Sequence, residues 1–219
     1  MKVVALIAAA SIALAALGVV ALASRAGTPR VSAAEAATIR EPRHGMPTEP
    51  AADAAITAHA RTTVAGEVWK IVSYRAKSGA LCAGVTWPGE GQEMGCATED
   101  GWFARGPVSV SVAARQAHGR PLSWQNIVLS GLVDLGRVQK LELVSTDCSR
   151  RAIQLDADGF FLDVTSRGSI ARGAWPYRLL GEDGSGRVVQ TIDVELEAPD
   201  TAEARAAGVH PPVAGAACA

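Results

Sequence analysis

The bulky apolar side chains of this chain are concentrated in one segment, and this concentration limits what can fold. All ten aromatic residues lie between Trp69 and Tyr177. Of the 64 apolar residues other than alanine, 46 fall within residues 64–198. A segment that buries little apolar surface cannot offset the conformational entropy lost on folding. The sequence therefore predicts one folded domain over residues 64–198, long enough to bury a core of its own.

The segments on either side of this domain are rich in alanine and proline. Residues 25–63 and 199–219 contain no aromatic residue and few bulky aliphatic residues. We therefore expect residues 25–63 to form a disordered linker and residues 199–219 to form a flexible tail.

The amino-terminal segment is apolar enough to enter a membrane. Residues 3–23 contain no charged side chain, and Lys2 precedes them. At a rise of about 1.5 Å per residue, a helix of this length spans a hydrocarbon core of roughly 30 Å. Residues 1–24 are therefore expected to be a signal anchor that holds the carboxy-terminal domain outside the cell. The alternative is a cleaved signal peptide, because Ala21-Leu22-Ala23 matches a signal peptidase site before Ser24; the protein would then be secreted.

Within residues 64–198 the apolar pattern is that of β-strands. Residues 108–112 read Val-Ser-Val-Ser-Val, and residues 190–196 place Ile192, Val194 and Leu196 on one face. Such alternation is typical of half-buried strands. Asp-Gly turns such as Asp158-Gly159 and Asp183-Gly184 separate the candidate strands. The pattern predicts an all-β fold: an antiparallel, immunoglobulin-like sandwich of about eight or nine strands, preceded by one hydrophobic N-terminal helix.

Four cysteines are candidates for disulfide bonds in an exported domain: Cys82, Cys96, Cys148 and Cys218. Cys82 and Cys96 lie on consecutive candidate strands joined by a Pro- and Gly-containing turn, so a bridge across this hairpin is favoured. The remaining pair, Cys148–Cys218, would tie the tail to the sandwich. The alternative for that pair is a buried thiol at Cys148 and a free chain end.

A resemblance rests on the runs at residues 67–75, 79–82, 131–133 and 158–161, together with Gly95-Cys96 and residues 183–189. In this order they resemble signal-anchored extracytoplasmic β-sandwich proteins of high-GC Gram-positive bacteria, an uncharacterised group. The resemblance covers residues 64–198. It implies an envelope location and a disulfide hairpin, and it implies no activity or catalytic residue.

The charge balance argues against a nucleic-acid partner. Lys and Arg together number 21 and Asp and Glu 22, giving a formal net charge of −1. Nucleic-acid binders usually carry a basic excess or a basic stripe, because they displace counterions from phosphates.

The histidines give little support for catalysis or metal binding. Three of them, His44, His59 and His210, fall in the expected linker or tail, and His118 falls in a loop. The sequence contains no hydrolase, zinc-protease or nucleotide-binding motif. Asp156-Ala157-Asp158-Gly159 is expected to be a hairpin turn rather than a calcium loop, because Phe160 and Phe161 follow where further oxygen ligands would be needed. We therefore predict no catalytic residue, no metal and no cofactor.

The best candidate for a contact surface is the loop that carries Trp102, Phe103 and Arg105, because aromatic and arginine side chains are favoured at binding hot spots. The alternative is that Trp102 and Phe103 cap one end of the sandwich.

The function expected from the sequence is binding or structural interaction at the cell envelope, with a protein or envelope component as partner. The alternatives are a small envelope hydrolase that uses a carboxylate pair and the ectodomain of a regulatory membrane complex.

Overall fold

The computed structural model describes residues 29–64, 66–87, 91–116, 124–172 and 174–195, together with Cys218. These residues form eleven strands and a few short helices, so the prediction of an all-β fold is confirmed. The strands are β1 (Thr57–Val64), β2 (Glu67–Arg75), β3 (Leu81–Trp87), β4 (Gly91–Ala97), β5 (Val108–Gln116), β6 (Trp124–Val133), β7 (Lys140–Ser145), β8 (Arg150–Ile153), β9 (Phe160–Ser166), β10 (Pro176–Glu182) and β11 (Val188–Asp193). The helices are α1 (Ala33–Arg40), the 3-10 helix η1 (Glu41–Arg43), α2 (Glu99–Trp102) and α3 (Arg167–Ala171).

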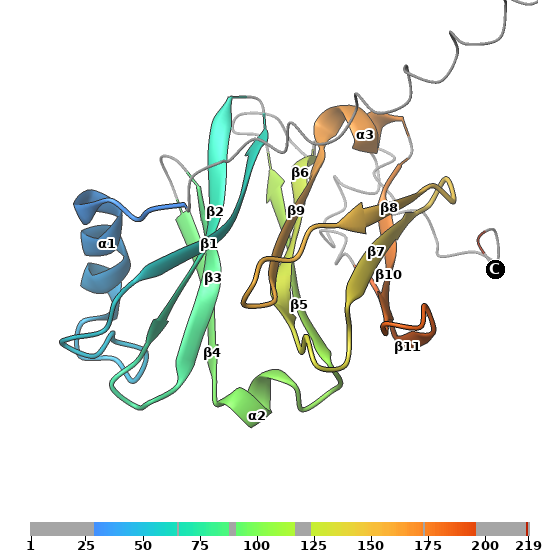
Figure 1. Ribbon diagram of the computed structural model, residues 1–219. Helices are drawn as coiled ribbons and strands as arrows, with labels where there is room; N and C mark the ends of the chain where they lie inside the picture. The colour runs from blue at the N-terminus through green and yellow to red at the C-terminus, as the bar shows by residue number, and fades with distance from the viewer. Residues whose placement is uncertain are drawn as a thin grey trace, which may run out of the picture.

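The strands form three antiparallel sheets that stack as layers (Figure 1). The first sheet has the order β1-β2-β3-β4, the middle sheet β5-β6-β9, and the third sheet β11-β10-β7-β8. From left to right in Figure 1 the layers are α1, the first sheet, the middle sheet and the third sheet. The described strands thus outnumber the eight or nine that were expected, and a third layer is added to the expected two-layer arrangement.

The middle sheet is buried on both faces. On β6, Val128 and Leu132 pack with Phe160 against Trp69 and Ile71 of the first sheet. The alternate residues of the same strand point the other way, because successive side chains of a strand point to opposite faces. Leu129 and Val133 pack with Phe161 against the third sheet, which contributes the buried side chains of Leu141, Leu143, Ile153 and Leu179. A strand buried on both faces is a nearly continuous apolar run, and residues 127–129 and 132–133 of β6 have that character.

Two polar contacts also join the third sheet to the middle sheet. The guanidinium of Arg151 on β8 makes a two-pronged ion pair with the buried carboxylate of Asp163 on β9, and its Nη2 lies 2.6 Å from Asp163 Oδ2. The Gln190 side chain of β11 accepts a hydrogen bond from the Val108 amide and donates one to the Val108 carbonyl, over 2.8 and 3.3 Å. These contacts satisfy polar groups that the stacking of the layers would otherwise leave unpaired.

The prediction of a disordered linker over residues 25–63 is wrong for α1, η1 and β1. Strand β1 pairs along β2, and Ile39 of α1 is only 1% exposed because it packs on Val72 and Tyr74 on the outer face of the first sheet. A strand needs backbone hydrogen bonds more than bulky side chains, so alanine and threonine suffice for β1. The sequence argument counted only large apolar residues and therefore missed this strand.

Polar contacts fix the start of α1. Ser32 caps the helix: its hydroxyl accepts from the Glu35 amide, and the Glu35 carboxylate accepts from the Ser32 amide. The Glu35 carboxylate also accepts a hydrogen bond from Lys70 Nζ of β2 over 2.7 Å. Burial raises the pKa of Glu35, but the hydrogen bonds from Lys70 and Ser32 outweigh it and lower that pKa below its usual value. The capping box and this ion pair hold α1 against the first sheet.

The favoured bond Cys82–Cys96 is present, and so is Cys148–Cys218, the pairing that the sequence left open. Cys82 on β3 bonds to Cys96 directly opposite on β4, with Cα atoms 4.0 Å apart. Cys148, in the turn between β7 and β8, bonds to Cys218, with Cα atoms 5.2 Å apart. In the chain-entropy model, closing loops of these lengths contributes about 3–4 kcal/mol each.

The expected signal anchor (residues 1–24) and the expected tail apart from Cys218 lie outside the described residues. Among the helices that the structure describes, none is long and apolar enough to cross a membrane.

We predict that Gly131→Ala lowers the free energy of unfolding by about 3 kcal/mol, the upper end for overpacking a core. A Cβ at Gly131 would overlap the Ser109 carbonyl oxygen and lie 2.8 Å from the Phe161 ring, so β5 and the ring would have to move. Chemical denaturation of both proteins measures the difference. The control is Gly95→Ala on β4, where the added Cβ meets only the Trp102 ring at an ordinary 3.5 Å. Equal losses in the two variants would contradict the close packing of the middle sheet.

Candidate functional site: a buried histidine beside an interlayer pocket

His59 lies at an irregularity in strand β1. The register between β1 and β2 shifts between the pairs Ala58↔Val72 and Arg61↔Lys70. Two residues of β1 therefore lie opposite one residue of β2, which is the pattern of a β-bulge. The consecutive residues Ala58 and His59 are nevertheless both buried, because the first sheet is covered on both faces. Ala58 packs on the outer face of the first sheet, whereas His59 faces the middle sheet.

The His59 ring is held on two sides. Its Nε2 lies 2.7 Å from the hydroxyl oxygen of Ser73 on β2, and the ring stacks on Phe160 of β9 with centroids 3.9 Å apart. The His59 side chain is 7% exposed. Since Ser73 and Phe160 belong to two different sheets, the histidine lies in the space between the first and middle sheets.

Two aspartates approach the other ring nitrogen from the turn between β8 and β9. The Nδ1 of His59 lies 3.3 Å from Asp156 Oδ2 and 3.4 Å from Asp158 Oδ2. The second oxygen of Asp156, Oδ1, accepts hydrogen bonds from the backbone amides of Asp158 and Phe160. Gly159 completes the turn at φ +84°, a conformation that favours glycine. The turn chemistry thus occupies Oδ1 and leaves Oδ2 facing the histidine.

The order Ser73, His59, Asp156 is that of a serine-hydrolase triad, but the geometry does not support nucleophilic catalysis. A nucleophilic serine must reach a substrate carbonyl. Ser73 is only 7% exposed, lies on an inner strand of the first sheet and does not line the pocket described below. Its hydroxyl instead fixes the orientation of the imidazole. When the ring proton is on Nε2, the hydroxyl accepts it, and the Nδ1 lone pair then faces the two carboxylates.

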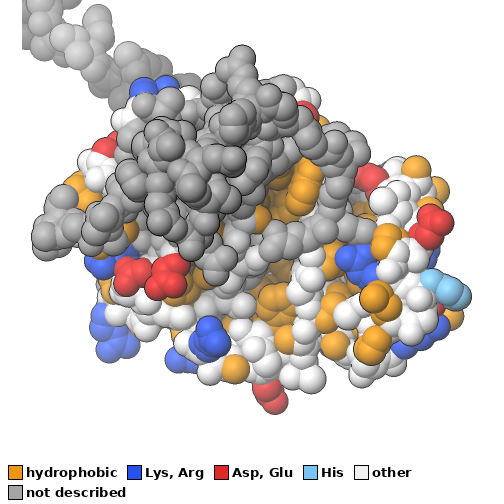
Figure 2. Space-filling view, turned by 180° about the vertical axis from the view of Figure 1, so that it is seen from behind, with side chains coloured by type: hydrophobic (Ala, Val, Ile, Leu, Met, Phe, Trp, Pro, Cys, Tyr) orange, Lys and Arg blue, Asp and Glu red, His pale blue; other side chains and the backbone are white. Residues whose placement is uncertain are grey.

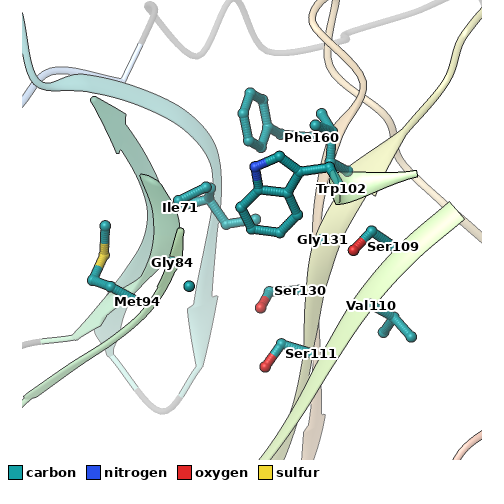
Figure 3. A pocket seen from close by; sticks show the side chains of 13 residues that line it. Ile71, Gly84, Met94, Trp102, Ser109, Val110, Ser111, Ser130, Gly131 and Phe160 are labelled. Atoms are coloured by element: carbon teal, nitrogen blue, oxygen red, sulfur yellow. The ribbon is translucent and has the colours of Figure 1, made fainter. Parts of the chain in front are cut away.

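A pocket of about 160 Å³ lies between the first and middle sheets, on the side where the edge strands β4 and β5 face each other (Figure 3). The first sheet contributes Gly84 and Met94 to one wall, and the middle sheet contributes Ser109, Ser111 and Ser130 to the other, while the Met94 side chain itself packs on the outer face of the first sheet. The remaining walls are the apolar or small side chains of Ile71, Ala83, Gly95, Trp102, Val110, Gly131, Leu132 and Phe160. Phe160 therefore both lines the pocket and stacks on His59.

The structure places the predicted contact residues at one end of this interlayer space. Trp102 ends α2, which connects the first sheet to the middle sheet, and its Nε1 donates to the Leu81 carbonyl over 3.1 Å. Trp102 and Phe103 both pack against the core between these sheets, and Trp102 also forms a wall of the pocket. Arg105 is exposed. The two aromatic residues thus cap the core, and Trp102 is in addition available to a ligand.

Sequence reasoning missed His59 and Ser73, because it assigned His59 to the linker and Ser73 to an ordinary strand. The run Thr62-Thr63-Val64 is β-branched, as strands often are, and would have suggested that a strand begins before residue 64. The bulge and the approach of the Asp156 turn depend on contacts between distant segments. Of the other histidines, His44 is exposed beside Glu49, and His118 and His210 lie outside the described residues.

Comparisons of the chain with protein-family models, with curated proteins and with solved structures give no match. The function of the site is therefore argued from its geometry.

We predict that His59→Gln lowers the free energy of unfolding by about 2–3 kcal/mol, because it removes a buried stacked ring and leaves Ser73 without its partner. The matched control is His44→Gln: the His44 side chain is 88% exposed, so its replacement is expected to change stability by less than about 0.5 kcal/mol. Thermal or chemical denaturation compares the two. Equal, small effects would mean that His59 behaves as a linker residue.

Proposed function

We propose that this protein is an exported binding domain of the cell envelope that takes up an uncharged ligand group in the pocket between its first and middle sheets. Residues 1–24 would anchor it in the membrane with the folded part outside, or would be removed to release it. The observation that carries the proposal is the pocket itself, whose thirteen lining residues are all uncharged.

The walls of the pocket suit one class of ligand group. A volume of about 160 Å³ is close to that of engineered cavities which hold a single benzene ring, roughly 150 Å³. Trp102 and Phe160 offer aromatic surface, and three serine hydroxyls on the middle sheet offer hydrogen bonds. This combination favours a single ring with an apolar face and hydroxyl or amide groups. A charged group would lose its hydration there without an opposite charge to compensate.

The disulfides support the envelope location. Disulfides persist in oxidising compartments outside the cytosol and are rare inside it. Cys82–Cys96 joins two strands of the first sheet, and Cys148–Cys218 joins the turn between β7 and β8 to the carboxy-terminal segment. The apolar segment of residues 3–23 and the resemblance to signal-anchored extracytoplasmic proteins point the same way.

We also propose that strands β5–β11 form the immunoglobulin-like sandwich expected from the sequence, and that β1–β4 are an added layer. Seven strands in sheets of three and four, β5-β6-β9 and β11-β10-β7-β8, match the strand count of an immunoglobulin-like domain. The chain changes sheet between β6 and β7, returns to the middle sheet at β9 and leaves it again at β10, as in a Greek key. The pocket then lies at the joint between this sandwich and the added layer.

The other functions receive less support. A hydrolase with a carboxylate pair would need facing acids in a pocket, and no Asp or Glu is among the described residues that line this one. A nucleic-acid partner would need a basic surface. Figure 2 instead shows acidic and basic side chains interspersed over the described part of that face. An ectodomain of a membrane complex differs from the proposal only in that a protein partner would supply the ligand group.

We predict that uncharged single-ring compounds and soluble envelope glycan fragments change the tryptophan fluorescence of the purified full chain, because Trp102 forms a wall of the pocket. Ser111→Leu on the edge strand β5 should fill the pocket and weaken this binding at least tenfold. Titration of each probe against the wild type and the variant measures the effect.

The matched control is Thr191→Leu, the same kind of substitution at an exposed position on β11, which is the edge strand of the third sheet. It should bind as the wild type does. A pull-down from solubilised membranes with the same three proteins identifies the natural partner. If Ser111→Leu binds as well as the wild type, or if no envelope component is retained, the proposal is wrong.

A further inference from the structure

We propose that His59, Asp156 and Asp158 bind one divalent metal ion of the zinc class. None of these three residues lines the pocket, although Phe160, which does, stacks on His59. The metal site does not depend on the binding function proposed above. The three side chains offer one imidazole nitrogen and two carboxylate oxygens, and these ligand atoms all lie within 4.8 Å of one another.

The distances inside the cluster fit a metal better than a direct ion pair. A charge-assisted hydrogen bond between a histidine and a carboxylate is about 2.7–2.9 Å long. The two separations from His59 Nδ1, 3.3 Å to Asp156 and 3.4 Å to Asp158, are longer than that. Zinc ligands lie about 2.0–2.1 Å from the metal, so two ligand atoms at a tetrahedral angle are about 3.3–3.4 Å apart. The separations of 3.3 and 3.4 Å therefore equal the distance between two ligand atoms of one tetrahedral zinc ion.

The surroundings of His59 are those of a positioned metal ligand. A histidine that binds a metal usually donates its other ring N–H to a neighbouring acceptor, which fixes the tautomer. Here Nε2 lies 2.7 Å from Ser73 Oγ, and the ring is stacked on Phe160, so Nδ1 is directed at the carboxylates. The side chain is more than nine-tenths buried. The cluster therefore combines an acidic turn with a buried imidazole whose Nδ1 is directed at the two carboxylates.

The turn also directs its carboxylates. Because the backbone amides of Asp158 and Phe160 occupy Asp156 Oδ1, the other oxygen points away from the turn. Exposure rises from 7% at the His59 side chain to 25% at Asp156 and 69% at Asp158. This gradient gives a metal ion an entry path from solvent and leaves a fourth position open to water. The nitrogen ligand favours zinc over calcium or magnesium, which prefer oxygen ligands.

The test is a zinc titration of the full chain, purified without a histidine tag and freed of metal, with a competing chelator dye as the reporter. We expect one zinc ion per chain. Asp156→Asn and Asp158→Asn should each weaken binding at least tenfold. Asparagine keeps the oxygen that accepts the turn hydrogen bonds, so the turn survives in Asp156→Asn. Ser73→Ala should weaken binding about 10–100-fold, because it releases the orientation of His59.

Two matched controls separate a specific site from general attraction of cations. Asp183 forms the same kind of turn between β10 and β11, where its Oδ1 accepts from the Ser185 and Arg187 amides, and no histidine lies beside it in the contacts of the described residues. The Ser185 hydroxyl and the Arg187 amide lower the pKa of Asp183 to about 2, so Asp183→Asn also removes one full negative charge at neutral pH. His44→Gln removes an exposed histidine that lies beside Glu49.

The site is supported if both control variants bind zinc as tightly as the wild type and the Asp156 and Asp158 variants lose zinc affinity. Cobalt gives an independent readout, since its visible absorption bands report coordination by these ligands. The proposal is overturned if the wild type binds no stoichiometric zinc, or if either aspartate variant keeps wild-type affinity. Circular dichroism of every variant without metal shows that its fold is retained.

Discussion

Burial of the middle sheet on both faces is the constraint on which the rest of the structure depends. Strand β6 contributes Val128 and Leu132 to the core of the first sheet and Leu129 and Val133 to the core of the third. Such a sheet is stable only while both neighbours stay in place, because removing one would expose a full face of apolar side chains to water. The Arg151–Asp163 ion pair and the Gln190 side chain join the middle sheet to the third sheet on one side. On the other side the first sheet packs on the middle sheet, His59 of β1 contacts Asp156 and Asp158 in the turn before β9, and α1 covers the outer face of the first sheet.

The joint between the first and middle sheets carries both proposed sites. Towards the edge strands β4 and β5 the sheets leave a pocket with apolar, aromatic and hydroxyl groups. At β1 His59 lies against Phe160 and the Asp156 turn. Phe160 contacts both regions, so a ligand in the pocket and an ion on His59 would each restrict the same ring. A sandwich of β5–β11 alone would have neither site, since each needs side chains from the first sheet.

Much of the fold follows from local sequence patterns, whereas the candidate site does not. Alternation within residues 108–112 predicted a strand, the Asp-Gly turns predicted hairpins, and the placement of Cys82 and Cys96 around a Pro- and Gly-containing turn favoured their bond. The error at β1 arose because its side chains are small, and small residues are compatible with both a linker and a paired strand. His59 became a site residue only through the pairing of β1 with β2, the contact with Ser73 and the return of the chain at Asp156 almost a hundred positions later. Contacts of that range leave no trace in periodicity or composition. Trp102 was recognised as notable from its residue type, but its position in a pocket wall depended on how two sheets meet.

Native-state hydrogen exchange of the full chain tests the central claim, that β1 and the first sheet are part of one stacked body and not an appended linker. Amides of buried, cooperatively folded strands exchange only through large-scale unfolding, whereas amides of disordered segments exchange almost without protection. We expect the slowest exchange at β6, in residues 127–132. We also expect clear protection in β1, where residues 57–58 and 61–64 pair with β2. Unprotected amides throughout β1 would contradict the account, because His59 could then not be held against Phe160 and the Asp156 turn.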